Sequence, residues 1–487
     1  MLLQRETPPA TSRRTRKLSD ELATLSVTKL AAMIRARAIS PVEAVEACLR
    51  RIEHLNPRLN AIITLAPDAL SQAREAERAV MRGASLGPLH GVPITIKDTI
   101  DTAGLRTTYG SRLWSAHVPQ RDAPAVARLK AAGAILLGKT NVSELALAYT
   151  ADNPLFGRTN NPHDLARTPG GSSGGEAAAI SACLSPAGLG SDLTGSIRVP
   201  AHFCGIFGLK PTTERAPAVG HVPPNRGPLA LGACLGPLAR TVDDLALVFN
   251  ILSELDLRPP PARARSRMAL RGQRAAWYVY DTVTPVTEET CRAVEAAARA
   301  LSAAGLEVFE ARPPGVERGP HLWSALFSRA ASNFVREMYA GQIEQAGPLA
   351  RAVIERSDTP LPGVDQYLDA WNERDRRRAT LIEWLSTTPL VIAPVGATPA
   401  FAHEARQVTV GDQALGLFRS FGYAQTCNVF NLPAVCAPAG RSPEGLPIGV
   451  QIIGRPYDED RLFAAAAVIE EALGGWQSPA SSSSVKI

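Results

Sequence analysis

Apolar residues recur at three- and four-residue spacing through long parts of this 487-residue chain, and short apolar runs rich in branched residues lie between them. The first pattern is typical of amphipathic helices and the second of buried strands. Helices are expected at 18–56, 66–83, 124–132, 242–255, 288–304, 315–385 and 458–473. Strands are expected at 60–65, 91–97, 134–140, 203–212, 275–280, 306–311, 389–395, 431–440 and 445–456. This alternation predicts an α/β fold with a largely parallel sheet covered by helices.

The length allows two or three average domains or one large α/β domain, and the charge is concentrated at one end. The formal net charge is +6, but residues 1–17 hold five basic residues and one acidic residue, which accounts for +4. The rest of the chain is therefore close to neutral. Because a nucleic-acid-binding face needs clustered basic charge on the folded part, we expect no nucleic-acid partner.

The seven cysteines are scattered and include no CxxC pair, which predicts buried free thiols in a reducing compartment. The chain has neither an apolar run long enough to span a membrane nor the apolar core of a secretory signal near its N-terminus. We therefore expect a cytoplasmic protein without membrane contact. No HExxH motif or paired-cysteine spacing favours a metal site, and no cofactor is expected.

The stretch 168–200 (TPGGSSGGEAAAISACLSPAGLGSDLTGSIRVP) contains two glycine-flanked turns, and each carries a serine, Ser172 or Ser196. Glycine at this density is used where the backbone bends sharply or approaches another group closely. Lys97 ends the apolar run VPITI, so burial is expected to lower the pKa of its amine. A serine is a weak nucleophile until a base takes its proton, and a neutral lysine can be that base. Together the three residues predict an acyl-transfer site.

Three other interpretations fit parts of this pattern. The turn PGGSSGG could cradle a phosphate, although it has neither GxxxxGK[ST] nor GxGxxG spacing and Glu176 would repel the anion. A serine–histidine site could use His202 or His163, although the chain has no GxSxG motif. Cys204 follows an aromatic residue and is expected in the core rather than as a nucleophile.

Three motifs taken together resemble the amidase signature family: GPLHGVPITIKD, PGGSSGGEAAAI and GSDLTGSIRVPAHFCGIFGLKPT. The resemblance extends to the N-terminal helices and to GLPIGVQIIGRPYDEDRL, so it covers most of 20–475. It implies a single α/β/α domain around a large, mixed, twisted sheet at 19–475, between disordered tails at 1–18 and 476–487. Residues from about 255 to 390, where no match is found, are expected to vary within the family and to shape the substrate site.

The resemblance also implies a Ser–cis-Ser–Lys triad. Ser196 would attack the carbonyl, Ser172 would relay the proton, and Lys97 would accept it as a neutral base. A cis peptide bond would join Gly171 to Ser172. The backbone N–H groups expected to form the oxyanion hole are those of Leu193, Thr194, Gly195 and Ser196. The residues expected to support the site without reacting are Gly171, Ser173, Asp192 and Arg198.

Thr194 is a departure from the family pattern, because many members have a second glycine at this place before the nucleophile. The backbone donor is kept, so the chemistry is expected to be kept as well. The added side chain is expected either to narrow the acyl pocket or to constrain the loop. By analogy, the pocket residues are expected in 146–155, 315–385 and 418–428.

The leading hypothesis for function is hydrolysis of the C–N bond in a small uncharged amide, aryl or alkyl, through an acyl-enzyme on Ser196, with esters as side substrates. One alternative is a carbamate or urea-type hydrolase with the same triad. A second is the glutaminase subunit of a tRNA-dependent amidotransferase, and a third is a non-catalytic binding protein. The expected partner is a small-molecule amide or carbamate, with no nucleic acid and no membrane, and a homodimer is the expected oligomeric option.

Overall fold

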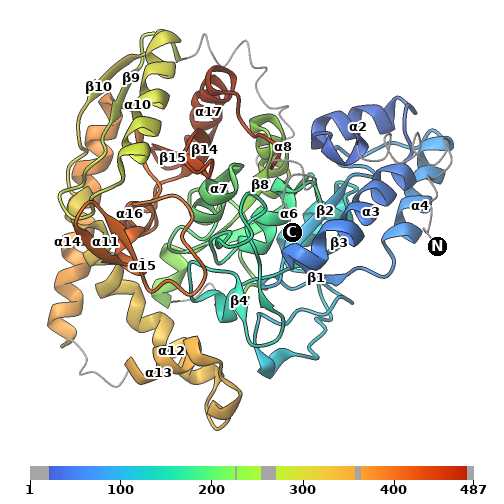
Figure 1. Cartoon of the computed structure of the whole chain (residues 1–487), viewed down its shortest axis with the longest axis horizontal. Coiled ribbons are helices and arrows are strands. Elements are labelled where there is room, and N and C mark those ends of the chain that lie inside the picture. The colour runs from blue at the N-terminus through green and yellow to red at the C-terminus, as the bar shows by residue number, and fades with distance from the viewer. Residues whose placement is uncertain (1–20, 225–226, 254–269, 357–362, 480–487) are drawn as a thin grey trace, which may run out of the picture.

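A central sheet of eleven strands organises the computed structural model, which describes residues 21–224, 227–253, 270–356 and 363–479 (Figure 1). The strands follow the order β1-β3-β2-β6-β8-β7-β14-β15-β11-β9-β10 across the sheet. Their bounds are Ile62–Leu65 (β1), Pro93–Lys97 (β2), Ile135–Thr140 (β3), Ala187–Asp192 (β6), Phe207–Lys210 (β7), Cys234–Ala239 (β8), Arg274–Trp277 (β9), Glu307–Glu310 (β10), Leu390–Pro394 (β11), Ala434–Arg441 (β14) and Pro447–Gly454 (β15). The tail expected at 1–18 and most of the tail expected at 476–487 lie outside the described residues.

The sheet is mixed, as the resemblance implies, and it is less parallel than the strand–helix rhythm predicts. Six of the ten neighbouring strand pairs in the described sheet are antiparallel. One reason is the short link between β14 and β15, because neighbouring strands joined by so few residues can only run antiparallel. The parallel pairs are β2 with β3, β2 with β6, β9 with β10, and β9 with β11.

Helices cover both faces of the sheet (Figure 1). Their bounds are Val27–Arg35 (α2), Pro41–Leu59 (α3), Ala69–Met81 (α4), Pro124–Ala131 (α5), Gly174–Ser181 (α6), Arg198–Cys204 (α7), Val242–Ser253 (α8), Glu288–Ala303 (α10), Gly319–Trp323 (α11), Arg329–Met338 (α12), Pro348–Arg356 (α13), Val364–Thr387 (α14), Leu417–Ser420 (α15), Gly422–Val429 (α16) and Glu459–Leu473 (α17). A single π-helical turn, Ser324–Ser328, joins α11 to α12. Two small hairpins complete the described elements: Asp152–Asn153 (β4) with Gly157–Arg158 (β5), and Gln407–Val410 (β12) with Gln413–Gly416 (β13).

Side-chain alternation along the strands divides the core into layers. In β11, Leu390 and Ile392 join the cluster that also holds residues of α8, α10 and α17. Their neighbours Val391 and Ala393 face the other way and pack with residues of α11, α14 and α16. Successive side chains of a strand point to opposite faces, so one strand contributes to both layers. The two layers enclose the sheet between helices.

Local signals in the sequence explain where helices begin. The Ser40 hydroxyl accepts a hydrogen bond from the Glu43 N–H at 3.1 Å, and the Glu43 carboxylate accepts one from the Ser40 N–H at 2.8 Å. This reciprocal cap, with Pro41 in the first turn, starts α3 at the predicted place. In Figure 1, α2 to α4 lie beside the β1 end of the sheet, while α10 and α14 lie beside the β9–β10 end.

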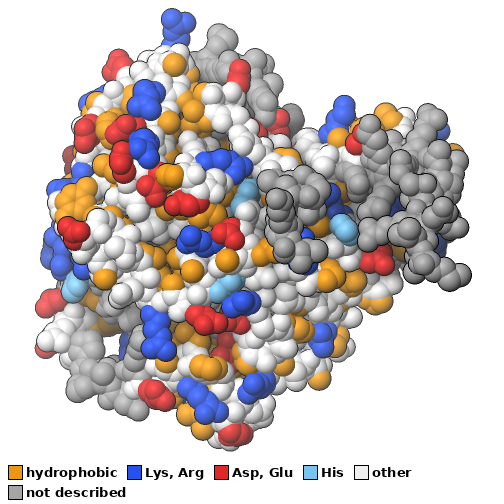
Figure 2. Space-filling view, in the orientation of Figure 1, with side chains coloured by type: hydrophobic (Ala, Val, Ile, Leu, Met, Phe, Trp, Pro, Cys, Tyr) orange, Lys and Arg blue, Asp and Glu red, His pale blue; other side chains and the backbone are white. Residues whose placement is uncertain are grey.

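Segment 315–385, expected to be helical, forms α11 to α14 where it is described. The region without a motif also supplies β9, β10 and the last part of the sheet's edge, so it belongs to the same sheet as the motifs. Acidic and basic side chains are intermixed over the face seen in Figure 2. In the described part of the chain, no helix has the length and apolar content needed to cross a membrane.

Candidate active site

The candidate site lies where two neighbouring parallel strands end. Strands β2 and β6 run in register through Thr95 and Gly188. Lys97 is the last residue of β2 and Asp192 is the last residue of β6. Because the carboxyl ends of parallel strands meet at one edge of a sheet, the two side chains are delivered to the same place.

Lys97 is completely buried and is held by two serines. Its Nζ donates to Oγ of Ser172 at 2.7 Å and to Oγ of Ser191 at 2.8 Å. Burial lowers the pKa of the amine to about 7, against the opposing charges of Asp192 and Glu176. About half of the Lys97 side chains are therefore neutral near pH 7, which is the condition for an amine to accept a proton.

The first glycine-flanked turn presents Ser172 to the lysine. The peptide bond between Gly171 and Ser172 is cis, and Ser172 is fully buried. A side chain at position 171 has no room, because its Cβ would lie 2.0 Å from the carbonyl oxygen of Thr150. The next residue, Ser173, donates its N–H to the Ser196 carbonyl at 3.1 Å and its hydroxyl to the Ser191 carbonyl at 3.3 Å. Ser173 therefore ties the first turn to the second.

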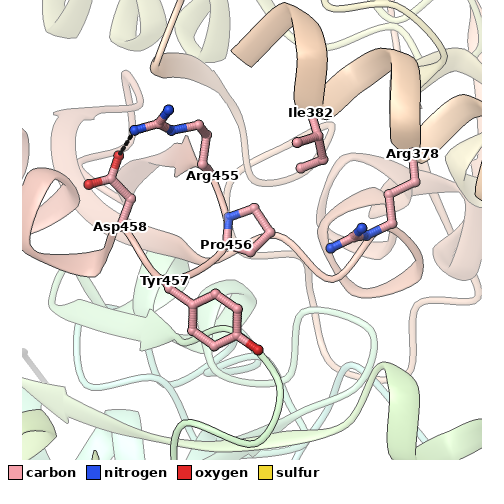
Figure 3. Close-up of a pocket in the computed structure, with 6 residues that line it drawn as sticks. All are labelled: Arg378, Ile382, Arg455, Pro456, Tyr457 and Asp458. Atoms are coloured by element: carbon pink, nitrogen blue, oxygen red, sulfur yellow. Dashed lines mark hydrogen bonds and ion pairs between the residues drawn. The ribbon is translucent and has the colours of Figure 1, made fainter. Parts of the chain in front are cut away.

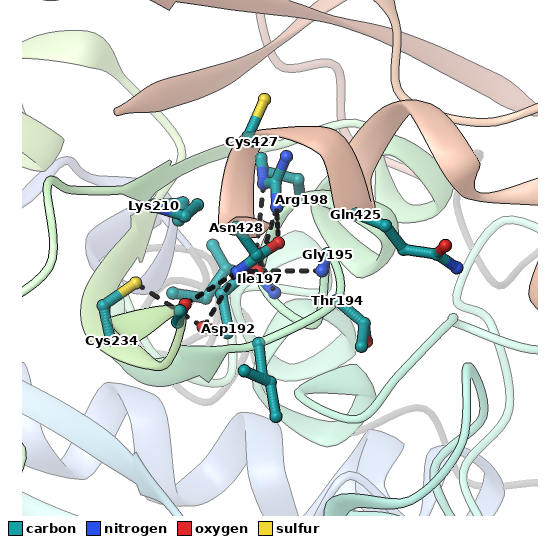
Figure 4. Close-up of polar contacts among 12 residues, drawn as sticks. Asp192, Thr194, Gly195, Ile197, Arg198, Lys210, Cys234, Gln425, Cys427 and Asn428 are labelled. Atoms are coloured by element: carbon teal, nitrogen blue, oxygen red, sulfur yellow. Dashed lines mark hydrogen bonds and ion pairs between the residues drawn. The ribbon is translucent and has the colours of Figure 1, made fainter. Parts of the chain in front are cut away.

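The second turn, 192–196, is shaped by the carboxylate of Asp192. One carboxylate oxygen accepts the Gly195 N–H at 2.8 Å, and the other accepts the Ile197 N–H at 3.2 Å (Figure 4). Gly195 has φ +109°, and a Cβ there would lie 2.6 Å from Cβ of Ala424. Both the backbone conformation and the contact with α16 therefore require glycine at this place. Ser196, 6% exposed, ends the turn.

A buried ion pair fixes Asp192 (Figure 4). Arg198 contacts the carboxylate through Nε at 3.1 Å and Nη2 at 2.9 Å, and neither side chain is exposed. Burial alone would raise the pKa of Asp192, but the guanidinium of Arg198 holds it well below its usual range. Asn428 and Gln451 accept the remaining hydrogen bonds of Arg198, at 2.7 and 2.8 Å. The pair is thus both charge-balanced and hydrogen-bonded, as a buried ion pair must be.

The carbonyl groups of residues 193 and 194 are turned toward aromatic side chains. Nε1 of Trp323 donates to the Leu193 carbonyl at 2.8 Å, and the Tyr149 hydroxyl donates to the Thr194 carbonyl at 2.9 Å. Phe418 packs against both aromatic rings, with ring centroids 5.0 Å from Trp323 and 6.3 Å from Tyr149. Each of the three segments expected to supply pocket residues therefore contributes an aromatic residue to this cluster.

The residues of the competing interpretations lie in structural positions. Both ring nitrogens of His202 contact backbone atoms, and burial lowers the pKa of this histidine to about 4. Burial likewise lowers the pKa of His163 to about 4, and its ring contacts Ser181 and the Cys204 carbonyl. The Cys204 thiol is buried and has a raised pKa for the same reason. Among the described residues, no group of three His, Cys, Asp or Glu side chains could hold a metal ion.

Two buried residues near Lys97 are missing from the predicted set. Ser191 holds the amine directly, and Glu176 accepts hydrogen bonds from the hydroxyls of Thr95 and Thr140 beneath β2. Burial raises the pKa of Glu176 to about 7. Glu176 stands inside the quoted motif, so the position could have been singled out, but only the fold shows that its carboxylate turns inward beside the lysine strand.

Comparisons with known proteins agree with this geometry. The amidase family matches residues 43–463. The A component of a glutamyl-tRNA(Gln) amidotransferase, from Chloroflexus aurantiacus and named as one of that enzyme's subunits, is 36% identical over 91% of this chain and 95% of its own length. The protein of the same name from Carboxydothermus hydrogenoformans is 32% identical over 93% of this chain and 98% of its own. The chain therefore belongs to the amidase signature family, whose hydrolases cleave amide C–N bonds.

Solved structures support the same assignment. One, described as an s-triazine catabolic enzyme with a vestigial protein complex, has a TM-score of 0.85 at 28% identity and covers 93% of this chain and all of its own (100%). A bacterial aryl acylamidase of the amidase signature family has a TM-score of 0.81 at 26% identity, covering 94% and 97%. The peptide amidase of Stenotrophomonas maltophilia has a TM-score of 0.77 at 27% identity, covering 95% and 99%.

The predicted partners are wrong. A small-molecule amide or carbamate as the partner, no nucleic acid, and at most a homodimer were expected from the near-neutral body. The curated relatives instead carry a name that specifies a tRNA and one subunit of an enzyme. Net charge is a poor guide here, because in an assembly the basic surface that meets a nucleic acid can lie on a different polypeptide.

Proposed function

We propose that this chain is the glutamine-hydrolysing subunit of a tRNA-dependent amidotransferase, and that it cleaves the side-chain amide of glutamine through an acyl-enzyme on Ser196. The contact that carries the chemistry is the bond between buried Lys97 and Ser172. The substrate and the assembly are supported by the name of the curated relatives, which are similar to this chain over nearly their whole length.

In the proposed reaction, neutral Lys97 accepts a proton from Ser172 while Ser172 takes the proton of Ser196. The Ser196 oxygen then attacks the amide carbonyl, and the same relay returns the proton to the leaving ammonia. Water attacks the acyl-enzyme by the reverse route. The amine with a pKa near 7 supports this role, because such a group both accepts and releases protons near neutral pH.

Backbone N–H groups of the second turn would stabilise the negative charge that develops on the carbonyl oxygen. The N–H of Gly195 already donates to Asp192, so this proposal keeps Leu193, Thr194 and Ser196 as the oxyanion donors. The bonds from Trp323 and Tyr149 to the carbonyls of residues 193 and 194 support the assignment, since they fix the two peptide planes. Asp192 and Arg198 then act by positioning the turn.

The experiment measures ammonia release from glutamine by the chain alone and by the chain mixed with the other subunits of a glutamyl-tRNA(Gln) amidotransferase and charged tRNA. We expect release to rise with the subunits and to disappear in Ser196→Ala, while Ser185→Ala, another buried serine, keeps it. Release that survives Ser196→Ala would move the nucleophile elsewhere. No glutamine hydrolysis under any of these conditions would refute the substrate.

A second candidate is hydrolysis of an aryl or alkyl amide. The observation that favours it is the aromatic cluster of Tyr149, Trp323 and Phe418 beside the second turn, which offers apolar surface to an acyl or leaving group. An anilide, an aliphatic amide, a p-nitrophenyl ester and an aryl carbamate belong in the same assay. Turnover of the anilide without turnover of glutamine would select this candidate over the first.

A further inference from the structure

A second cavity lies away from the candidate active site, between α14 and the loop that follows β15. Its volume is about 410 Å³, and Figure 3 shows the residues that line it. Helix α14 contributes Arg378 and Ile382, and the loop contributes the run from Arg455 to Asp458. The volume falls within the range of small-molecule sites in proteins.

Basic charge around this cavity exceeds acidic charge. Arg374 pairs with Asp375 at 2.5 Å. Arg455 and Arg461 share one carboxylate, that of Asp458, at 3.4 and 2.7 Å. In the described part of the chain, no carboxylate forms an ion pair with Arg378, whose Nε donates to the Phe430 carbonyl at 2.9 Å. Four guanidinium groups therefore meet two carboxylates.

Arg378 is the residue on which this excess falls. Its side chain is half-buried, and burial, followed by the charge of Arg374, lowers its pKa. Its Nε bond leaves the two terminal nitrogens of the guanidinium for other acceptors. In Figure 3 the guanidinium points into the same space as the ring of Tyr457. Such a fork matches the paired oxygens of a phosphate.

Tyr457 supplies an aromatic face beside this charge. The residue has φ +67°, an uncommon conformation for a side chain other than glycine, and its N–H donates to Oγ1 of Thr212 at 2.8 Å. The bond holds the backbone so that the ring is 63% exposed. Pro456 before it and Ile382 opposite it add apolar surface. An exposed ring that the backbone holds outward is a platform on which a planar base can stack.

We propose that this cavity binds a 5′-phosphorylated nucleoside, with the phosphate on Arg378 and the base against Tyr457. The ligand can be a free nucleotide or the 5′-terminal nucleotide of an RNA strand, because both present the same phosphate and base. This site is separate from Ser196 and does not depend on the proposed function, since its binding is measured without turnover.

The experiment titrates the full chain with AMP, inorganic phosphate and adenosine by calorimetry. We expect AMP to bind more tightly than either of its parts, and we expect added salt to weaken it. Arg378→Gln should weaken AMP and phosphate by about tenfold or more, because it removes a charged hydrogen-bond donor. Tyr457→Leu should weaken AMP by about tenfold and leave phosphate unchanged.

Arg376→Gln is the matched control, because Arg376 is an exposed arginine on the same helix and does not line the cavity. It should bind AMP as the wild type does, and the unfolding midpoint of every variant should stay at the wild-type value. A 5′-phosphorylated single-stranded RNA separates the two sources: tighter binding than AMP identifies an RNA end, and equal binding identifies a free nucleotide. AMP binding that is absent, equal to phosphate alone, or insensitive to Arg378→Gln would overturn the proposal.

Discussion

Ser191 gives a direct test of Lys97 as the proposed base. Nζ of Lys97 lies 2.8 Å from Oγ of Ser191, and both residues are buried. A hydrogen bond to a charged group contributes about 1.5–3 kcal/mol, and it favours the ammonium more than the neutral amine. Ser191→Ala removes this bond, so the charged form loses stability. Because about 1.4 kcal/mol corresponds to one pH unit, the pKa of Lys97, about 7 in the wild type, should fall by about one.

The assay is the pH dependence of kcat/KM from about pH 5 to about pH 9, because this profile reports the ionisation of the free enzyme. In the wild type the acid limb should have its midpoint near pH 7, where Lys97 loses its proton. In Ser191→Ala the midpoint should move to about pH 6. Ser185→Ala is the matched control, because the Ser185 hydroxyl is buried and donates to the Ala187 carbonyl.

An acid limb that stays in place in Ser191→Ala, or that moves to higher pH, would refute the reasoning. In that case the group that titrates would not be an amine held by Ser191. The thermal unfolding midpoint of the variant guards against a trivial cause, since a misfolded site would lower both the rate and the midpoint. A shift with an unchanged unfolding midpoint supports the neutral amine as base.

Three further predictions concern buried charge. Lys97→Met should lower kcat by several orders of magnitude and remove the acid limb near pH 7, measured as product release across the pH range. Asp192→Asn should reduce the free energy of unfolding by about 3 kcal/mol in denaturant titration, because it leaves Arg198 buried without its partner. Burial raises the pKa of Glu176 to about 7, so its contribution to stability is present below pH 4.5, the usual pKa, and is lost as the pH rises through 7. The stability of the wild type relative to Glu176→Gln should therefore fall by about 3 kcal/mol over that interval, and a flat difference would contradict it.

Periodicity predicted most of the sheet because most strands follow the expected pattern. Strand β2 is an unbroken run of buried residues, and β15 and α17 follow one another where the sequence places them. Strand β8 escaped because its sequence, CLGPLA, contains glycine and proline, which are depleted in strands. In the fold it lies between β6 and β7, with Pro237 opposite Leu189. Tertiary packing overrides local preference at this place.

The site was predictable in its local parts and unpredictable in its long-range ones. Lys97, Ser172 and Ser196 each stand in a short pattern that the sequence displays directly. Asn428 and Gln451 do not, because they reach Arg198 from 230 and 253 residues away. A single sequence carries no information on such pairings. The fold supplies it through α16 and β15, which bring the two amides beside the ion pair.

Thr194 shows how the fold narrows a choice that the sequence leaves open. The sequence allows the added side chain either to narrow the acyl pocket or to constrain the loop. The Thr194 carbonyl is held by Tyr149, whose hydroxyl also accepts a hydrogen bond from Gln425 of α16 at 3.1 Å. Gly195, next in the chain, is pinned by Asp192 and by the contact with Ala424. Neighbouring elements therefore restrain this part of the turn through backbone atoms, whatever side chain stands at position 194. It follows that the substitution acts mainly on the space beside the turn, and so on substrate choice more than on the geometry of the N–H groups.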